Sequence, residues 1–255
     1  MCYEARAFTA PKIKYVEQYG ERLLDADKLL RRLEGVTPMY YASGFDHPDL
    51  PVITSYSDEL QMFGWGLIPH WVNNSEGVVQ IQNQTLNARA ESIFEKPSFK
   101  DSVLKRRCLV ILDGFFEYHH KNGKAFPYHI VRKDGLPMSL AGVWDTWQGE
   151  GMERKTVSIV TTRANHLMTR IHNNPKTSDG PRMPVILPRE HETEWLRLDA
   201  DDQEELKELL VPMDDELLEA YTVPRLKGKR SVGNTAAAIS KHFYPELTTV
   251  QTGLF

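Results

Sequence analysis

The sequence RCLVILDGFFEYHH, residues 107–120, holds the longest apolar run of the chain and decides its fold class. Its β-branched and aromatic residues predict β structure. The next four residues, Lys121-Asn122-Gly123-Lys124, predict a hairpin turn, because Asn-Gly supplies the positive φ angles that a two-residue turn needs. The run FPYHIV, residues 126–131, would then form the second arm of the hairpin.

Further short β-like runs surround this hairpin: MYYA (39–42), PVITSY (51–56), ELQMFGWGLI (59–68), SLAGVWDTW (139–147) and TVSIVTT (156–162). Residues 12–34 predict one or two amphipathic helices that Gly20 breaks or kinks. Pro188 can open another helix, which carries Glu190–Leu198. Strands in one run with helices at both ends indicate an α+β fold with a mainly antiparallel sheet.

The composition is that of a soluble globular protein, with 255 residues, a formal net charge of −4, 41% hydrophobic and 26% charged residues. It excludes disordered, collagen-like and coiled-coil proteins. We expect one domain, residues 1–255, because no linker interrupts the chain. Asp113 and Gly114 interrupt the longest apolar run, so we expect no membrane span and no membrane partner.

Two cysteines, Cys2 and Cys108, are too few for a disulfide scaffold or a four-cysteine zinc site. The first twenty residues lack the apolar stretch of a secretory signal. We therefore expect a cytoplasmic protein with reduced thiols. We also expect neither a metal nor another cofactor.

The negative net charge is concentrated in residues 201–219, which contain nine acidic residues and one lysine. We interpret this segment as the solvated face of a helix. The rest of the chain is mildly basic, with 30 basic and 26 acidic residues. A local anion-binding surface is therefore compatible with the composition.

Cys2 directly follows the initiator Met1, whose removal is favoured because the second residue is small. The mature chain would begin with a 1,2-aminothiol, in which the amine can form an imine with an aldehyde and the thiol can close a thiazolidine. An α-amino group has a pKa of ~7.8, against ~10.4 for lysine, so much more of it is neutral at pH 7. The alternative from this residue alone is a cysteine buried as a small apolar side chain.

Asn87 and Arg89 lie two residues apart, so on an extended strand their side chains share a face. An amide and a guanidinium placed in this way suit a phosphodiester or a sugar, although such pairs also occur on surfaces without a ligand. Glu117 lies among aromatic residues that would desolvate its carboxyl group, which is useful in a general acid–base. The alternative is a glutamate on the solvated face of a half-buried strand.

His172 precedes the polar loop NNPKTSDGP, where it can transfer protons or serve as a structural histidine. Trp71 follows a proline turn, where an exposed ring would stack on bases and a buried ring would pack in the core. Four basic residues could either bind a phosphate backbone or lie in a solvated loop: Arg225, Lys227, Lys229 and Arg230.

Several of these segments occur in a specific order: Met1-Cys2, Trp-Gly-Leu-Ile-Pro-His-Trp (65–71), Asn-Ala-Arg-Ala-Glu (87–91), Gly-Phe-Phe-Glu-Tyr (114–118), Ile171-His172, Arg182-Met183-Pro184 and Val232-Gly233-Asn234. The ordered set resembles the SRAP (SOS response-associated peptidase) family of abasic-site processing proteins, over residues 2 to about 247. The resemblance implies an α+β fold with a barrel-like, mainly antiparallel sheet and flanking helices.

The resemblance also implies a sensor of abasic sites in single-stranded DNA, without an obligate protein partner. The mature Cys2 would capture the ring-opened aldehyde of the lesion in a thiazolidine crosslink. The protein would thus be an enzyme with a crosslinking or lyase-type activity. Asn87 would position the N-terminus and the deoxyribose. Glu117 would act as general acid–base in crosslink formation and reversal, and His172 would assist opening of the sugar.

Three further residues would bind the DNA itself. Arg89 and Arg182 would contact the phosphates that flank the lesion, and Trp71 would stack on a neighbouring base. Members of the family commonly continue Cys-Gly-Arg, whereas this chain reads Cys2-Tyr3-Glu4, which makes Arg6 the candidate substitute for the missing arginine.

Two more departures concern spacing and shape. Many members have His-x-Arg-Met-Pro, but nine residues, 173–181, separate His172 from Arg182 in this chain. The inserted loop must bulge out if both side chains are to reach one site. Val72 stands where some members carry a second aromatic residue after the stacking tryptophan.

Two other functions stay open from the sequence. Cys2, Glu117 and His172 could support a thiol peptidase, including an autopeptidase that removes Met1. A binding module for single-stranded or modified DNA would need no covalent chemistry. Cys2→Ala separates the covalent function, which it abolishes, from the binding module, which it leaves intact.

Overall fold

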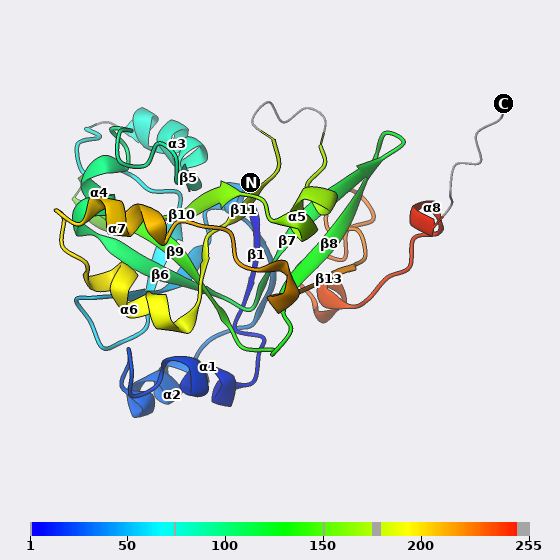
Figure 1. Cartoon of the computed structure of the whole chain (residues 1–255), viewed down its shortest axis with the longest axis horizontal. Helices are drawn as coiled ribbons and strands as arrows, with labels where there is room; N and C mark the ends of the chain where they lie inside the picture. Colours follow the sequence, from blue (N-terminus) through cyan, green and yellow to red (C-terminus); the bar gives the residue numbers. More distant parts are fainter. Residues whose placement is uncertain (1, 74, 150, 175–179, 249–255) are drawn as a thin grey trace.

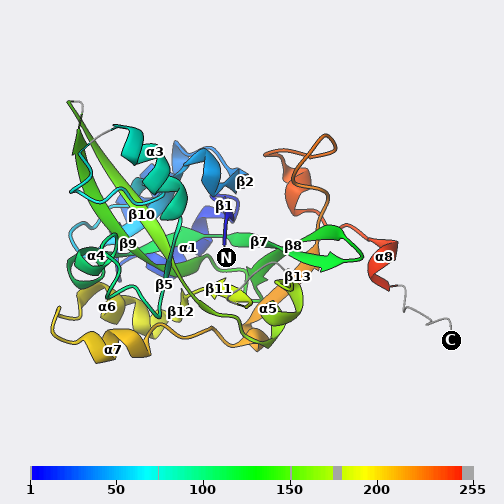
Figure 2. The same cartoon turned by 90° about the horizontal axis from the view of Figure 1, so that it is seen from above.

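The computed structural model describes residues 2–73, 75–149, 151–174 and 180–248 of the chain. Two β-sheets form the centre of the described part, and helices lie around them (Figures 1 and 2). Within these ranges no helix combines the length and the apolar character that crossing a bilayer requires.

The larger sheet closes into a five-stranded barrel. The strands pair in the order β10 (Met152–Arg163), β4 (Gln61–Trp65), β3 (Asp49–Thr54), β6 (Arg107–Leu112) and β9 (Met138–Gly149), and β9 pairs again with β10. Short strands extend this barrel: β5 (Asn87–Arg89) and β11 (Arg182–Pro184) pair with β10, and β12 (Ile186–Leu187) pairs with β9. Among the strands of the described residues, β10 pairs in parallel with β4 and with β5, and the other strand pairs of this sheet are antiparallel. The predicted α+β class with a barrel-like, mainly antiparallel sheet is confirmed.

The second sheet is antiparallel throughout. Its order is β13 (Leu218–Thr222), β8 (Lys124–Arg132), β7 (Gly114–Lys121), β1 (Glu4–Ala7) and β2 (Met39–Ser43). The predicted hairpin joins β7 to β8, with φ angles of 51° at Asn122 and 72° at Gly123. The pairing of β1 with β7 places the start of the chain beside the strand that carries Glu117.

The run at residues 107–120 forms two strands instead of one continuous strand. It breaks at Asp113, so that β6 belongs to the barrel and β7 belongs to the second sheet. Gly114 permits this corner, since a Cβ atom there would lie 2.5 Å from Nε2 of His129 and 2.7 Å from the carbonyl oxygen of Ile130. The corner turns β7 away from the barrel and toward β1.

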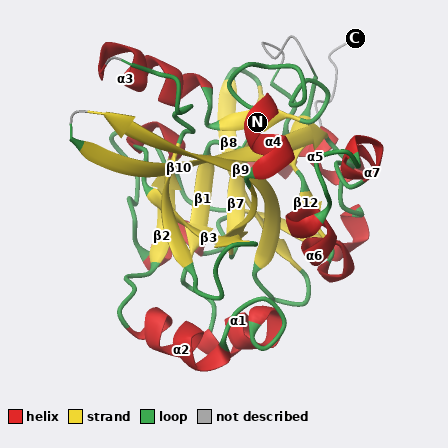
Figure 3. Cartoon of the chain, turned by 90° about the vertical axis from the view of Figure 1, so that its left-hand side faces the viewer, coloured by secondary structure: helices red, strands yellow, loops and turns green. Residues whose placement is uncertain are grey.

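The helices have the bounds α1 (Lys12–Tyr19), α2 (Ala26–Glu34), α3 (Ser75–Gln84), α4 (Lys100–Lys105), α5 (His166–Ile171), α6 (Arg189–Arg197), α7 (Gln203–Glu208) and α8 (Pro245–Thr248), with 3₁₀ turns at Gly44–Asp46, Asp215–Leu217 and Ala236–Ile239. Gly20 ends α1 and separates it from α2, as predicted. Pro188 precedes α6 at the predicted helix start. Figures 1 and 3 place α1 and α2 at one end of the molecule, and α3 and the start of the chain at the other.

The acidic segment 201–219 corrects one prediction. It is helical only over α7 and the 3₁₀ turn, and its last two residues, Leu218 and Glu219, already belong to β13. Main-chain pairing with β8 stabilises this edge strand in spite of its charge. The pattern of side chains in the segment does not predict such pairing.

Asp113 holds the corner between the two sheets. Its carboxylate accepts hydrogen bonds from the backbone N–H groups of Thr9 (2.6 Å) and Ala10 (2.9 Å), from the Thr9 hydroxyl (2.7 Å) and from the Tyr15 hydroxyl (2.6 Å). Asp113 is buried, so these donors have little access to water. The carboxylate therefore ties β1 and α1 to the point where β7 begins.

Asp113→Ala is expected to destabilise the fold by about 3 kcal/mol, because it leaves several buried donors without an acceptor. Urea unfolding monitored by tryptophan fluorescence measures this change. Asp58→Ala, which removes an exposed carboxylate, serves as the charge-matched control. Equal unfolding midpoints for the two variants would contradict the role assigned to Asp113.

Candidate active site

Cys2 lies next to β1, and 1% of its surface is exposed. Its thiol donates a long hydrogen bond, 3.8 Å, to the backbone oxygen of Glu4. Burial is the main cause that raises the pKa of the Cys2 thiol to about 12, and the negative charge of Glu117 adds to it. The thiol is therefore neutral at pH 7.

Asn87 comes from β5 and fixes the backbone of Cys2. Its Nδ2 donates a 2.8 Å hydrogen bond to the Cys2 carbonyl oxygen, across 85 residues of sequence. The Oδ1 atom of Asn87 is buried and has no hydrogen-bond partner among the described residues. Arg89 ends the same short strand and is half-buried. The prediction of an extended Asn87–Arg89 segment is confirmed.

Glu117 and His172 lie together, although they come from distant segments. Nδ1 of His172 is 3.5 Å from Oε2 of Glu117, and both side chains are largely buried. His172 follows α5, where its Nδ1 also lies 3.0 Å from the backbone oxygen and 3.2 Å from the backbone nitrogen of Arg182. These contacts keep His172 beside Arg182 in spite of the nine residues between them. Of that inserted loop, residues 175–179 lie outside the described residues.

A hollow of about 380 Å³ opens at this pair, lined by Tyr3, Glu117, Tyr118, His120, Ala125, His172, Asn174 and Lys227. Tyr3 directly follows Cys2 in sequence, so the hollow adjoins the start of the chain. We call it the Glu117 cleft. It combines a carboxylate, an imidazole and a lysine ammonium, which suits proton transfer next to an anionic ligand.

Several residues at the cleft have no recognisable role in the sequence. Glu4 is buried, and its carboxylate accepts a 2.7 Å hydrogen bond from the Tyr118 hydroxyl and pairs with Nζ of Lys227. Lys227 is one of four basic residues recognised in its loop, but nothing in the sequence separates it from the other three. Tyr118 directly follows Glu117 in the sequence, and this adjacency is the feature that could have identified Tyr118 as a residue of the site.

A carboxylate with no recognisable role in the sequence, Glu91, positions Arg182. The Arg182 guanidinium forms two bonds with Glu91, at 2.7 and 3.1 Å, and donates to the Thr161 backbone oxygen at 2.8 Å. Arg182 is buried, whereas the Glu91 side chain is 44% exposed. Any phosphate contact by Arg182 must therefore compete with Glu91.

Trp71 and Arg6 do not line the Glu117 cleft. Trp71 is 46% exposed on the turn before α3, and Figures 1 and 3 place α3 at the same end as the start of the chain. Its neighbour Val72 is buried and so presents no wedge at the surface. Arg6 contacts Thr9 and lines a separate hollow that includes Asp113 and Arg132. That position does not support Arg6 as a substitute for an arginine at position 4.

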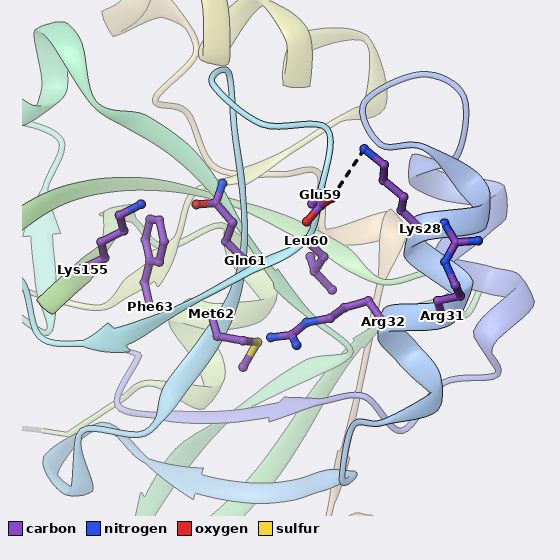
Figure 4. A pocket seen from close by; sticks show the side chains of 9 residues that line it. All are labelled: Lys28, Arg31, Arg32, Glu59, Leu60, Gln61, Met62, Phe63 and Lys155. Atoms are coloured by element: carbon purple, nitrogen blue, oxygen red, sulfur yellow. Dashed lines mark ion pairs between the residues drawn. The ribbon is translucent and has the colours of Figure 1, made fainter. Parts of the chain in front are cut away.

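A larger hollow of about 690 Å³ lies between α2 and β4 (Figure 4). It is basic, with Lys28, Arg31, Arg32 and Lys155 among its lining residues. No cysteine or histidine lines it, and its one carboxylate, Glu59, pairs with Lys28. The described residues contain no cluster of three metal-ligating side chains. The Glu117 cleft is therefore the candidate active site.

Comparison with known proteins finds a family and several relatives. The family model described as "SOS response associated peptidase (SRAP)" matches residues 22–229. The chain is 35% identical over 193 residues to a Bacillus subtilis (strain 168) protein named abasic site processing protein YoqW, covering 73% of this chain and 81% of that protein. The Mus musculus protein named abasic site processing protein HMCES is 30% identical over 180 residues, covering 59% of this chain and 48% of that protein.

Solved structures show the same fold. A protein from Bacteroides thetaiotaomicron superposes with a TM-score of 0.81 at 37% sequence identity, over 95% of this chain and 100% of that one. A protein from Bordetella bronchiseptica has a TM-score of 0.67 at 23% identity, a likeness of fold alone. The match over residues 22–229 and these similarities show that the chain belongs to the SOS response associated peptidase (SRAP) family.

Proposed function

We propose that this protein is an abasic-site sensor, which binds single-stranded DNA and crosslinks to the lesion through Cys2 after Met1 is removed. One observation carries the proposal: Asn87 holds the Cys2 carbonyl, and Tyr3, the residue after Cys2, lines the same cleft as the Glu117–His172 pair. The names of the relatives from Bacillus subtilis and Mus musculus support abasic DNA as the target.

The proposed reaction joins an aldehyde to an aminothiol. The Cys2 amine attacks the C1′ aldehyde of the opened sugar, and the carbinolamine loses its hydroxyl group as water to give an imine. The sulfur then attacks the imine carbon, and the thiol proton moves to the imine nitrogen. One C–N bond and one C–S bond form, the C=O bond is lost, and one water leaves.

The neutral thiol sets the order of these steps. Burial favours the neutral form of the Cys2 thiol, which would leave the amine as the first nucleophile and let the thiol react once a base accepts its proton. Glu117 is the nearby carboxylate that would protonate the departing hydroxyl and then accept the thiol proton. His172, 3.5 Å from Glu117, would transfer the proton that sugar opening requires. The orphan Oδ1 of Asn87 would accept a hydrogen bond from the mature amine.

The same thiol disfavours the peptidase alternative. A cysteine peptidase attacks with a thiolate, which needs a depressed pKa, whereas the pKa of Cys2 is raised. An abasic site has no base to recognise, so the aldehyde itself would provide specificity. Phosphate contacts and an exposed Trp71 would give binding that tolerates any sequence.

The test is a denaturing gel of the mature protein mixed with single-stranded DNA that contains one abasic site. A band that survives denaturation and requires the lesion is expected. Mass spectrometry confirms beforehand that Met1 is absent. If mature protein gives no such band, the covalent function is overturned.

Arg89→Ala is expected to weaken binding to intact single strands of any sequence, and to lower the slope of log K against log salt by about 0.7, one phosphate contact. Fluorescence anisotropy across a salt series measures the slope. Arg32→Ala removes an equal charge from α2, which lies at the end of the molecule opposite the start of the chain (Figure 1), and is expected to keep the slope of the wild type. An unchanged slope in Arg89→Ala would remove Arg89 from the phosphate path.

A further inference from the structure

Glu4 brings together two segments of the Glu117 cleft that are far apart in sequence. Its side chain is only 2% exposed, yet it is not isolated. One carboxylate oxygen accepts the hydrogen bond from Tyr118, the neighbour of Glu117, and the other pairs with Nζ of Lys227. Burial raises the pKa of Glu4, and Lys227 opposes that shift. The charge of Glu4 is therefore stabilised chiefly by Lys227.

Lys227 is held in place by its own segment as well. The preceding residue, Leu226, is buried in a small apolar cluster with Phe116, Val223 and Ala238. The following residue, Gly228, has a φ angle of 82°, which lets the chain turn directly after the lysine. The Ser231 hydroxyl closes the turn by donating a 2.7 Å hydrogen bond to the Leu226 backbone oxygen.

Farther along this segment, Asn234 attaches it to β2. Its Oδ1 accepts hydrogen bonds from the backbone nitrogens of Tyr40 (2.8 Å) and Tyr41 (3.1 Å). Lys227 is thus a positioned side chain in an anchored loop, unlike a freely solvated surface lysine.

The Lys227 ammonium still has capacity for a ligand. Its side chain is 56% exposed, it lies 5.3 Å from the centre of the Tyr118 ring, and it lines the Glu117 cleft. An ammonium group has three N–H donors, and Glu4 takes one of them. Lysine commonly binds phosphate as a compact point charge.

We propose that Lys227, oriented by Glu4, is a phosphate-binding residue of the Glu117 cleft, which takes the DNA phosphate next to the abasic sugar. This inference rests on the proposed function for the identity of the strand. Glu4 and Glu117 place two carboxylates at a site that must accept a polyanion. Lys227 offsets one of these charges and attracts the phosphate.

A double-mutant cycle separates phosphate binding from simple neutralisation of Glu4. The variants are Lys227→Ala, Glu4→Gln and the double variant Glu4→Gln/Lys227→Ala, and thermal unfolding verifies that each is folded. Lys12→Ala, at the start of α1 at the far end of the molecule, is the charge-matched control (Figure 1). The readout is the salt slope for an intact single-stranded oligonucleotide, to which no crosslink can form.

We expect Lys227→Ala and the double variant both to lose about 0.7 of the salt slope, while Glu4→Gln and Lys12→Ala keep it. A wild-type slope in the double variant would show that Lys227 only neutralises Glu4, and would overturn the inference. Absence of measurable binding of the intact oligonucleotide by the wild type would overturn it too.

The two proposals can fail separately. If the wild-type protein binds single strands but forms no adduct with abasic DNA, the covalent function fails, and the slope of the double variant still decides the role of Lys227. If the adduct forms and the slope of the double variant is unchanged, only the role of Lys227 fails.

Discussion

Cys2→Ser is expected to abolish the adduct that survives denaturation, although the variant keeps a small second residue and hence a free α-amine. The amine can still form an imine with the aldehyde, but no thiol closes the ring. The imine then hydrolyses or undergoes β-elimination, which cleaves the strand. We therefore expect loss of the stable band together with an increase in strand cleavage, both measured on one denaturing gel with end-labelled DNA.

Two additions make this result specific. Borohydride reduces an imine to a stable amine, so it is expected to restore a covalent band in Cys2→Ser. Cys108→Ser, which changes a buried cysteine of β6 in the barrel, is expected to crosslink like the wild type if it folds. A stable band in Cys2→Ser without reductant would contradict thiazolidine formation. The absence of a band in the presence of reductant would contradict attack by the amine.

Glu117→Gln is expected to have opposite effects on two reactions of the same cysteine. The carboxylate raises the pKa of the Cys2 thiol through its negative charge, second in size to burial. Removing that charge lowers the pKa, so at pH 8.5 more thiolate is present and alkylation by iodoacetamide is faster. Crosslinking to abasic DNA is slower, by about 10²- to 10⁴-fold, because the acid–base group is lost.

Peptide mapping by mass spectrometry measures the alkylation of Cys2 separately from that of Cys108. Single-turnover crosslinking at saturating DNA measures the second reaction. Glu34→Gln, an exposed change on α2 at the far end of the molecule, is expected to alter neither rate. If both reactions of Glu117→Gln became slower, the variant would have disturbed the position of Cys2, and the assignment of Glu117 as acid–base would not hold.

The fold was predictable from the sequence where local chemistry decides it. The Asn122-Gly123 turn, the end of α1 at Gly20 and the start of α6 after Pro188 all lie where the residues indicate. The corner at Asp113 was not predicted, because its cause is tertiary. Asp113 binds donors about 100 residues away in sequence, and the Cβ clash that requires Gly114 involves His129 and Ile130 of β8.

The residues of the candidate site also fall into two groups, those that the sequence predicts and those that depend on tertiary contacts. Residues within recognisable motifs, Asn87, Glu117 and His172, were identified, and the structure places each of them near the start of the chain or in the Glu117 cleft. The ion pair of Glu4 with Lys227 could not be predicted from the sequence, because the two residues are 223 positions apart and the fold of the C-terminal loop brings them together.

Strand β10 positions residues on both sides of the candidate site. Its Ile159 pairs with Asn87, and its Arg163 pairs with Arg182. His172 is in turn fixed by the backbone of Arg182. His172 and Arg182, which flank the segment 173–181, are therefore held in place by contacts outside that segment. Under the proposed function, relatives could therefore differ in the length of this segment while keeping His172 and Arg182 in place, and their preference for the DNA around the lesion would differ with it.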